Sequence, residues 1–390
     1  MRVGILTQPL RDNYGGLLQN YALQKVLQNL GHEPYTVDWY PPTPAFTLKG
    51  WLWKKKEQLL GLVHNNRQQF RYKPTKDEKA IISRNTSKFI QRNINVCPSF
   101  VSHHEDFFKT DERFLYDAYV VGSDQVWRPL YNYFQASMFL DFVKRENVKR
   151  IAYAASFGIA DWEFSQELTE TCSVLAKRFD LITVREKSGI ELCKEHLGIE
   201  AYQVLDPTML LSREDYEKLI GEENEPQSSG ALFHYILDPS KEKRLLIEEV
   251  AKDIGLKPFT IMPKCQAENR TRGDVKHRIE DCVFPSVTSW LRGFMDAEMI
   301  IVDSFHGAVF SIIFNKPFWV LSNAERGNAR FESLLTLYGL EDRMVSLNNM
   351  SGVDWQRKID WQRVNKIREK EKERCVSLLK HALICNKKFN

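Results

Sequence analysis

The sequence predicts an α/β protein built from two Rossmann-like units. Apolar strands alternate with amphipathic helices in two separate runs, and an acidic, loop-like stretch divides the runs. The chain has 390 residues, which is more than one compact core needs and enough for two domains.

The first run begins with a βαβ unit. Residues 2 to 7 predict a buried strand, residues 17 to 31 a helix that ends at a glycine, and residues 34 to 40 a second strand. Further strands are expected in "AYVVGSDQVW", "KRIAYAASFG", "DLITVRE" and "AYQVLDPTMLL". We assign residues 1 to 220 to an N-terminal domain that is interrupted by a basic, aromatic-rich and helical insertion at about residues 41 to 113.

The second run predicts a C-terminal domain over residues 221 to 354. Its expected strands are "ALFHYIL", "KPFTIMP", "EMIIVDS" and "KPFWVLS", with helices between them. A helix over residues 355 to 390 is expected to return to the first domain. Two such domains facing one another across a cleft resemble the glycosyltransferase-B architecture, in which the residues that follow the strands meet the ligand.

Composition excludes several classes of protein. A net charge of +4 does not indicate a nucleic-acid partner, and the seven cysteines form no CxxC pair. We find neither a signal peptide nor an apolar stretch long enough to span a membrane, so the expected location is the cytoplasm. Residues 51 to 73 are amphipathic and basic; packing on their own domain is favoured, and peripheral contact with the inner membrane face is the alternative.

The stretch "EMIIVDSFHGAVFSII" predicts a strand that turns directly into a helix. Ser304 and His306 would then lie at the carboxyl edge of the sheet, where the free backbone N–H groups of a helix N-terminus can bind an anion. Gly307 would let a ligand approach the backbone closely, and a histidine can exchange a proton near neutral pH. In the alternative interpretation, Ser304 is a helix N-cap and His306 a structural residue.

Two other strand ends carry polar residues. Arg185 follows a predicted strand and offers a planar fork for a carboxylate or phosphate, although a surface pair with Glu186 is the simpler interpretation. Ser123, Asp124, Gln125 and Trp127 follow another strand and suggest a sugar subsite; the alternative is a turn with a core tryptophan.

The loop before the first helix contains Asn13, Gly15 and Gly16. It could cradle a ligand, but it is neither a GxGxxG nor a Walker motif. The chain has no DxD pair, no HExxH and no GxSxG, so we expect no metal.

Six stretches, taken in order, resemble the polysaccharide pyruvyl transferase family from about residue 1 to about residue 340. They are "NYGGLLQNYALQ", "VVGSDQVW", "AYAASFG", "ITVREKSG", "VLDPTMLL" and "DSFHGAVFSIIFNKPF". The resemblance implies transfer of a pyruvyl group from phosphoenolpyruvate to two hydroxyls of a sugar, which become a cyclic ketal. It implies no cofactor, and an acceptor glycan that is free or lipid-linked.

The resemblance also implies roles for individual residues. It places His306 and Arg185 at the donor site, and we expect His306 to be the catalytic residue. From their positions in the sequence we also expect Ser304, Phe305 and Gly307 to bind the donor, and the residues at 13 to 16 and 123 to 127 named above to bind the acceptor. Some members have an arginine two positions before the histidine, where this chain has Ser304.

Two other functions fit the same fold. One is a glycosyltransferase that uses a nucleotide sugar without a metal. The other is a glycan-binding relative without catalytic activity.

Overall fold

The computed structural model describes residues 1–40, 74–265, 278–322, 328–348, 350 and 352–384, and the structural statements below concern these residues. The amphipathic stretch at residues 51 to 73, with its proposed membrane contact, lies outside them. Within the described part of the chain, no helix is long and apolar enough to cross a membrane.

The first sheet has six strands in the order β2-β1-β3-β4-β5-β6, and every pairing is parallel. Its strands are β1 (Arg2–Leu6), β2 (Glu33–Thr36), β3 (Ala118–Val121), β4 (Lys149–Ala155), β5 (Leu181–Val184) and β6 (Tyr202–Gln203). All four residues of β3 and of β5 are buried, as expected for inner strands covered on both faces.

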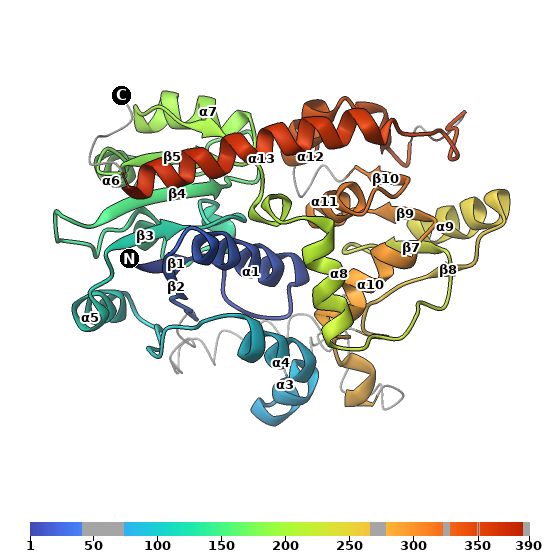
Figure 1. Cartoon of the computed structure of the whole chain (residues 1–390), viewed down its shortest axis with the longest axis horizontal. Coiled ribbons are helices and arrows are strands. Elements are labelled where there is room, and N and C mark those ends of the chain that lie inside the picture. The colour runs from blue at the N-terminus through green and yellow to red at the C-terminus, as the bar shows by residue number, and fades with distance from the viewer. Residues whose placement is uncertain (41–73, 266–277, 323–327, 349, 351, 385–390) are drawn as a thin grey trace, which may run out of the picture.

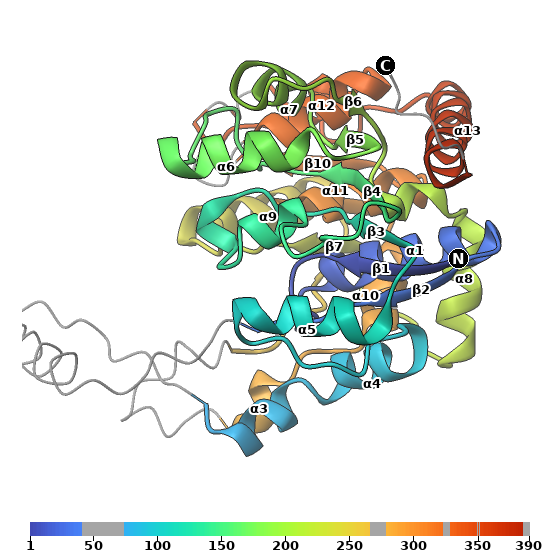
Figure 2. The ribbon, with the colours of Figure 1, turned by 90° about the vertical axis from the view of Figure 1, so that its left-hand side faces the viewer.

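Helices cover both faces of this sheet because successive residues of each strand point to opposite sides. Ala118 and Val120 pack in one apolar cluster with helix α1 (Tyr14–Asn29) and the C-terminal helix α13 (Trp361–Ile384). Tyr119 and Val121 pack in a second cluster with α5 (His104–Phe114) and α6 (Gln166–Ala176). Figure 2 shows these helices on the two sides of the sheet.

The second sheet has five parallel strands in the order β11-β10-β9-β7-β8. They are β7 (Leu232–Tyr235), β8 (Pro258–Phe259), β9 (Met299–Val302), β10 (Phe318–Leu321) and β11 (Met344–Val345). The helices of this unit are α9 (Lys241–Ile254), α10 (Val287–Asp296), α11 (Phe305–Ile313) and α12 (Ala329–Tyr338).

The two units lie side by side, and each sends an element to the other (Figure 1). Tyr14, in the first turn of α1, stacks on Trp290 of α10 with 5.5 Å between ring centroids, and its hydroxyl donates to the Pro285 carbonyl at 2.9 Å. Helix α13 contacts α12 and then β4 of the first sheet. The predicted fold class, two parallel-sheet α/β units of the glycosyltransferase-B type, is confirmed.

Residues 74 to 114 contain the helices α3 (Lys76–Ile82), α4 (Arg84–Asn93) and α5. Helix α8 (Arg213–Glu222) and the stretch after it connect the two units, and α7 (Ser188–Leu192) follows β5. The acidic stretch from residue 221 separates β6 from β7, while the division of the chain into domains at that stretch stays a prediction.

One predicted strand is much shorter in the structure than expected. Within "AYQVLDPTMLL" only Tyr202 and Gln203 pair with the sheet, and Pro207–Leu210 forms a 3₁₀ turn instead. Pro207 lacks the N–H that a strand needs, and the Asp206 side chain caps the turn by accepting from the Thr208 N–H at 3.0 Å.

Candidate functional site

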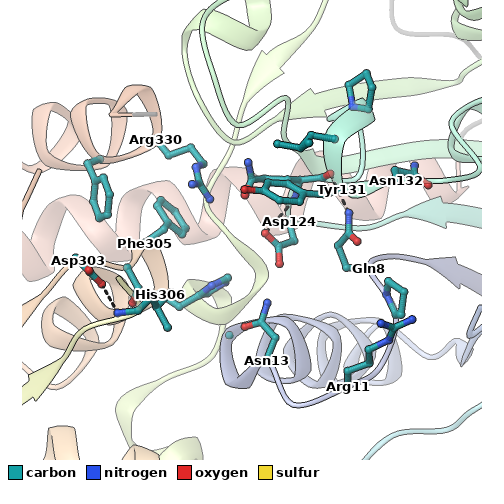
Figure 3. Close-up of a pocket in the computed structure, with 18 of the residues that line it drawn as sticks. Gln8, Arg11, Asn13, Asp124, Tyr131, Asn132, Asp303, Phe305, His306 and Arg330 are labelled. Carbon is teal, nitrogen blue, oxygen red and sulfur yellow. Dashed lines mark hydrogen bonds between the residues drawn. The ribbon is translucent and has the colours of Figure 1, made fainter. Parts of the chain in front are cut away.

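A cavity of about 780 Å³ lies between the two units, beside the carboxyl ends of β1, β3, β7 and β9. This is the edge at which parallel sheets bind ligands. Figure 3 shows residues from both units pointing into it. The lining includes Gln8, Arg11, Asn13, Gly15, Asp124, Gln125 and the segment 129 to 133 from the first unit, and Tyr235, Asp303, Ser304, Phe305, His306 and Arg330 from the second.

His306 lies in the first turn of α11, on the cavity wall. Its Nε2 is buried and lies 3.5 Å from Oδ2 of Asp206, a residue of the first unit. In the neutral ring, an ionised carboxylate at that point favours the tautomer with its proton on Nε2. The cavity wall therefore carries a proton-exchanging imidazole, and the Asp206 carboxylate helps to orient it.

Gly15 lies directly against the His306 ring. A Cβ placed on Gly15 would be 2.1 Å from Nδ1 and 2.4 Å from Cγ of His306, which no side chain can tolerate. Only glycine at this position lets the first turn of α1 approach the imidazole so closely. Gly15 therefore positions His306 across the boundary between the units.

Asp206 is a fully buried carboxylate at the end of β6. Its Oδ2 accepts from the Ser123 hydroxyl at 2.7 Å and from Arg185 at 3.1 Å, and its Oδ1 accepts from the Thr208 hydroxyl at 2.7 Å. Burial alone would raise the pKa of Asp206, but His306, Arg185 and the Ser123 hydroxyl hold that pKa well below its usual range. The residue is therefore a permanent anion at neutral pH.

Arg185 is only 4% exposed and does not line the cavity. It pairs with Asp206 and, at 3.4 Å, with Asp124, and its guanidinium lies 4.3 Å from the centroid of the Phe305 ring. The surface pair with Glu186 is wrong, because Glu186 is buried too and accepts the backbone N–H groups of Phe157 and Gly158. Its guanidinium contacts Asp124, Asp206 and Phe305, and a role of Arg185 in donor binding stays a prediction.

Asp124 lines the cavity above this ion pair. Burial would raise its pKa, but Arg185, His306 and Arg330 together lower the pKa of Asp124. Its Oδ1 also accepts from the Gln125 N–H at 3.0 Å. The site thus offers an ionised carboxylate whose direction is fixed.

Arg330 and Arg11 bring positive charge to the cavity. Burial and the nearby Arg185 lower the pKa of Arg330 to about 10, so it is still protonated at neutral pH. Arg11 lies at the exposed side, 4.9 Å from the ring centroid of Tyr40. Figure 3 shows Arg330 and Arg11 on opposite sides of the cavity.

The N-termini of α1 and α11 at the cavity are capped by side chains. Asn13 Oδ1 accepts from the Gly16 N–H at 3.2 Å, and Ser304 Oγ accepts from the Gly307 N–H at 3.0 Å. The interpretation of Ser304 as an N-cap is therefore confirmed, although its hydroxyl still lines the cavity. The Asp303 carboxylate forms an ion pair with Lys243 at 2.7 Å and accepts a hydrogen bond from the Leu237 N–H.

Several residues predicted to touch a ligand lie elsewhere. Trp127 is fully buried, stacks on Phe139 with 4.7 Å between ring centroids and donates to the Met138 carbonyl, so it is a core tryptophan. Gly307 packs on β9, because a Cβ there would lie 2.8 Å from the Val302 side chain. Ser123 is buried under Asp206, and Gly16 is not part of the cavity wall.

Other residues of the site were not singled out from the sequence. Asp206 stands in the stretch "VLDPTMLL", where it follows a strand as Asp124 does, and that position was an available signal. Arg330, Arg11 and Gln8 had none, because each lies in a stretch without a recognisable motif. Within the described ranges, no three His, Cys, Asp or Glu side chains are grouped as metal ligands would be.

Comparison with known proteins identifies the family. Residues 13–325 match the sequence model described as polysaccharide pyruvyl transferase. No curated protein matches the chain by sequence.

Among solved structures, similarity extends over nearly the whole chain at low identity. UDP-GlcNAc 2-epimerase from Neisseria meningitidis is 13% identical with a TM-score of 0.47, and the match covers 98% of this chain and 100% of that one. MurG of Acinetobacter baumannii is 10% identical with a TM-score of 0.43, with 97% of this chain and 98% of that one covered.

Replacement of Gly15 by alanine is expected to displace His306, whereas Gly16→Ala is not. Alanine normally stabilises a helix by about 1 kcal/mol relative to glycine, but at Gly15 the new methyl group would overlap the imidazole. At Gly16 the nearest atom is 3.2 Å away, on the Asn13 side chain. The His306 ring resonances in NMR spectra and thermal unfolding of both variants are the measurements. An unshifted His306 signal in a Gly15→Ala protein of parental stability would contradict the close contact.

Asp206→Asn is expected to destabilise the protein in a pH-dependent way. Removing one partner of a buried ion pair typically costs about 3–5 kcal/mol. Because the pKa of Asp206 is lower in the folded than in the unfolded state, its ionisation contributes stability that is fully present above the unfolded value of about 3.9. That contribution is lost as the pH falls below this value.

Urea unfolding of parent and Asp206→Asn from pH 7 to pH 3 measures this difference. We expect a constant gap between pH 7 and pH 5 and a shrinking gap below pH 4. A gap that does not change with pH would mean that the pKa of Asp206 is the same in the folded and unfolded states, and a gap that grows as the pH falls would mean that Asp206 is protonated in the folded protein.

Proposed function

Because the chain belongs to the polysaccharide pyruvyl transferase family, we propose that it moves a pyruvyl group from phosphoenolpyruvate onto two hydroxyls of a sugar. The product is a cyclic ketal on a polysaccharide or its precursor. The observation that carries this proposal is His306 on the cavity wall, with Nε2 directed at the buried Asp206 carboxylate. This pair can deliver a proton to a ligand, which is the first requirement of the reaction.

The proposed reaction needs proton transfer and electrostatic stabilisation. Protonation of the donor's C3 by His306 turns the CH₂ group into a methyl group and makes C2 electrophilic. One sugar hydroxyl then attacks C2 and loses its proton. Departure of inorganic phosphate leaves an oxocarbenium-like C2, and the second hydroxyl attacks it and loses its proton. One donor and one diol thus give one ketal and one phosphate, and no cofactor is needed.

Of the cationic side chains that line the cavity, Arg330 best suits an anionic group of the donor. Arg330 is buried, near Arg185 and Asp124, so its fork is held in a low-dielectric setting where a carboxylate or phosphate is bound strongly. Some family members have an arginine at the position of Ser304. In this chain we assign the role of that arginine, which is to bind a negative group of the donor, to Arg330. Arg185 then acts indirectly, by keeping Asp124 and Asp206 in place.

The acceptor hydroxyls fit the first unit. Asp124 stays ionised and can accept hydrogen bonds from a diol as the hydroxyls approach C2. Asn13 and Gln125 also line the cavity. Whether the acceptor is lipid-linked, and whether the protein works in the cytoplasm against a membrane, stay predictions of the sequence.

The decisive experiment is release of phosphate from phosphoenolpyruvate in the presence of acceptor glycans. We expect release that requires both substrates, and a ketal methyl signal in the product's NMR spectrum. Release of nucleotide from UDP-sugars without any use of phosphoenolpyruvate would instead establish a glycosyltransferase. Glycan binding without either reaction would establish the non-catalytic relative.

His306→Asn tests the proposed acid–base role in the same assay. Asparagine keeps a hydrogen-bonding group near Asp206 but cannot relay a proton, so turnover should fall by about 10²–10⁴-fold. The melting temperature should change little. Turnover within a few-fold of the parent would remove His306 from the catalytic step.

Arg330→Lys tests the donor anchor. Lysine keeps the charge but loses the planar fork, so the KM for phosphoenolpyruvate should rise by about tenfold while the acceptor KM stays the same. Arg213→Lys is the matched control, because Arg213 lies on α8 outside the cavity and pairs with Glu217 at 2.7 Å. An unchanged donor KM in a folded Arg330→Lys protein would exclude this role.

A further inference from the structure

One edge of the cavity carries three exposed apolar and aromatic side chains. Leu130, Tyr131 and Tyr133 are 68%, 44% and 66% exposed, and all three line the cavity. We call these three residues the aromatic rim. They lie on the first unit, in the segment that follows β3 and Asp124.

The backbone beneath the aromatic rim is held firmly by the residues between and beside its members. Arg128 is buried and pairs with Glu163 at 3.1 Å. The Asn132 side chain donates to the Val126 carbonyl at 2.7 Å and accepts from the Phe134 N–H at 3.0 Å. From Tyr131 to Phe134 exposed and buried residues alternate, so the buried residues hold the backbone that carries the rim side chains.

Phe134 anchors the segment in the core of the first unit. Its ring packs edge-on against Trp39 and Phe107, with centroid distances of 5.5 and 5.4 Å. Tyr133 in turn packs edge-on to Phe134 at 5.0 Å, and Tyr131 lies over the Arg128 guanidinium at 5.1 Å. These contacts limit the rotamers of both tyrosines, so little conformational entropy would be lost when a ligand lies on them.

The aromatic rim continues into the polar half of the cavity. The Tyr131 phenol is close enough to Arg330 to contribute to its pKa, which the phenol raises. Figure 3 shows Tyr131 between Arg330 and Asn132, above Asp124. Gln8, whose Nε2 donates to the Gln125 carbonyl at 2.9 Å, lies on the same side. A ligand lying on the aromatic rim would therefore have one edge near Asp124 and His306.

We propose that the aromatic rim is the acceptor platform, on which the terminal hexose or N-acetylhexosamine of a glycan lies with its apolar C–H face on Tyr131 and Tyr133. This inference rests on the proposed function for the identity of the reaction. Such a sugar has one face that suits an aromatic ring and an edge of hydroxyls that suits Asp124, Gln8 and Asn13. The rim side chains carry no charge, so the rim fits a neutral sugar ring.

The platform also explains where the reacting diol comes from. With the sugar face on the tyrosines, two neighbouring hydroxyls point along the cavity toward His306 and the donor's C2. Trp127 was expected to supply the stacking face, but it is in the core. The aromatic rim supplies that face six residues further along the same segment, at Tyr133.

The test is direct glycan binding without phosphoenolpyruvate, so that it does not depend on turnover. A panel of neutral oligosaccharides ending in galactose, glucose, mannose or an N-acetylhexosamine is screened by saturation-transfer NMR, and the dissociation constant of the best binder is measured by calorimetry. We expect the Tyr131→Ala/Tyr133→Ala double variant to bind about tenfold more weakly, which corresponds to about 1.4 kcal/mol. Tyr133→Phe should bind like the parent, because it keeps the ring.

Two controls separate the platform from general effects. Leu245→Ala removes an exposed leucine of α9 outside the cavity and should not change glycan affinity. In the turnover assay, Tyr133→Ala should raise the KM for the acceptor and leave the KM for phosphoenolpyruvate unchanged. A loss of glycan affinity in the double variant, in a protein that releases no phosphate, would support the platform and reject only the proposed reaction.

Other outcomes would overturn the platform. One is equal glycan affinity in parent and folded double variant, or no glycan of the panel bound by the parent. Another is a rim that serves a lipid surface: the double variant would then lose sedimentation with phosphatidylglycerol vesicles while its glycan affinity stayed the same.

Discussion

The buried ion pair between Arg185 and Asp206 is the interaction on which the rest of the site depends. Arg185 also reaches Asp124, and Asp206 also faces His306, so one guanidinium sets two carboxylates that serve the cavity. A buried charge is costly unless it is paired and hydrogen-bonded. Here the Ser123 and Thr208 hydroxyls complete the hydrogen bonds of Asp206. Its charge is therefore paired and hydrogen-bonded although almost no water reaches it.

The cluster also joins the two units of the chain. His306 and Phe305 come from the second unit, and they contact Asp206 and Arg185 of the first. The adjacent residues Tyr14 and Gly15 add an aromatic contact with Trp290 and a close approach to the His306 ring. The relative position of the units and the geometry of the candidate acid–base residue are therefore set by the same few contacts, which is the kind of preorganisation that catalysis requires.

The cavity has two chemically different walls. Its deeper part is polar and charged, with His306, Asp124 and Arg330, while one edge of its mouth is apolar and aromatic. Because Asn13 and Ser304 cap α1 and α11, anion binding at these two places resides more in side chains than in free backbone N–H groups. This division suits a small anionic donor held inside and a larger neutral sugar entering from outside.

Much of this architecture could be predicted from the sequence by local rules. Continuous apolar runs such as "AYVV" and "MIIV" predict inner strands of parallel sheets, and the polar residues after them predict which edge binds ligands. His306 and Asp124 were found in this way, and the structure places both on the cavity wall. Helix α12 and strand β11 were not predicted, because their patterns are short and weak next to the loops that precede them.

By itself, the sequence determined the fold class, the family and the edge of the sheet where the site lies, since each depends on patterns within a few neighbouring residues. Only the tertiary structure decided which polar residues face the cavity. Trp127, Arg185 and Asp124 lie within two similar strand-end motifs, yet the first is in the core, the second lies beneath the wall and the third lines it. Asp206 meets His306, 100 residues later, and Gly15 meets it from the other end of the chain. Contacts of this length depend on how the two sheets pack, and no local pattern records that packing.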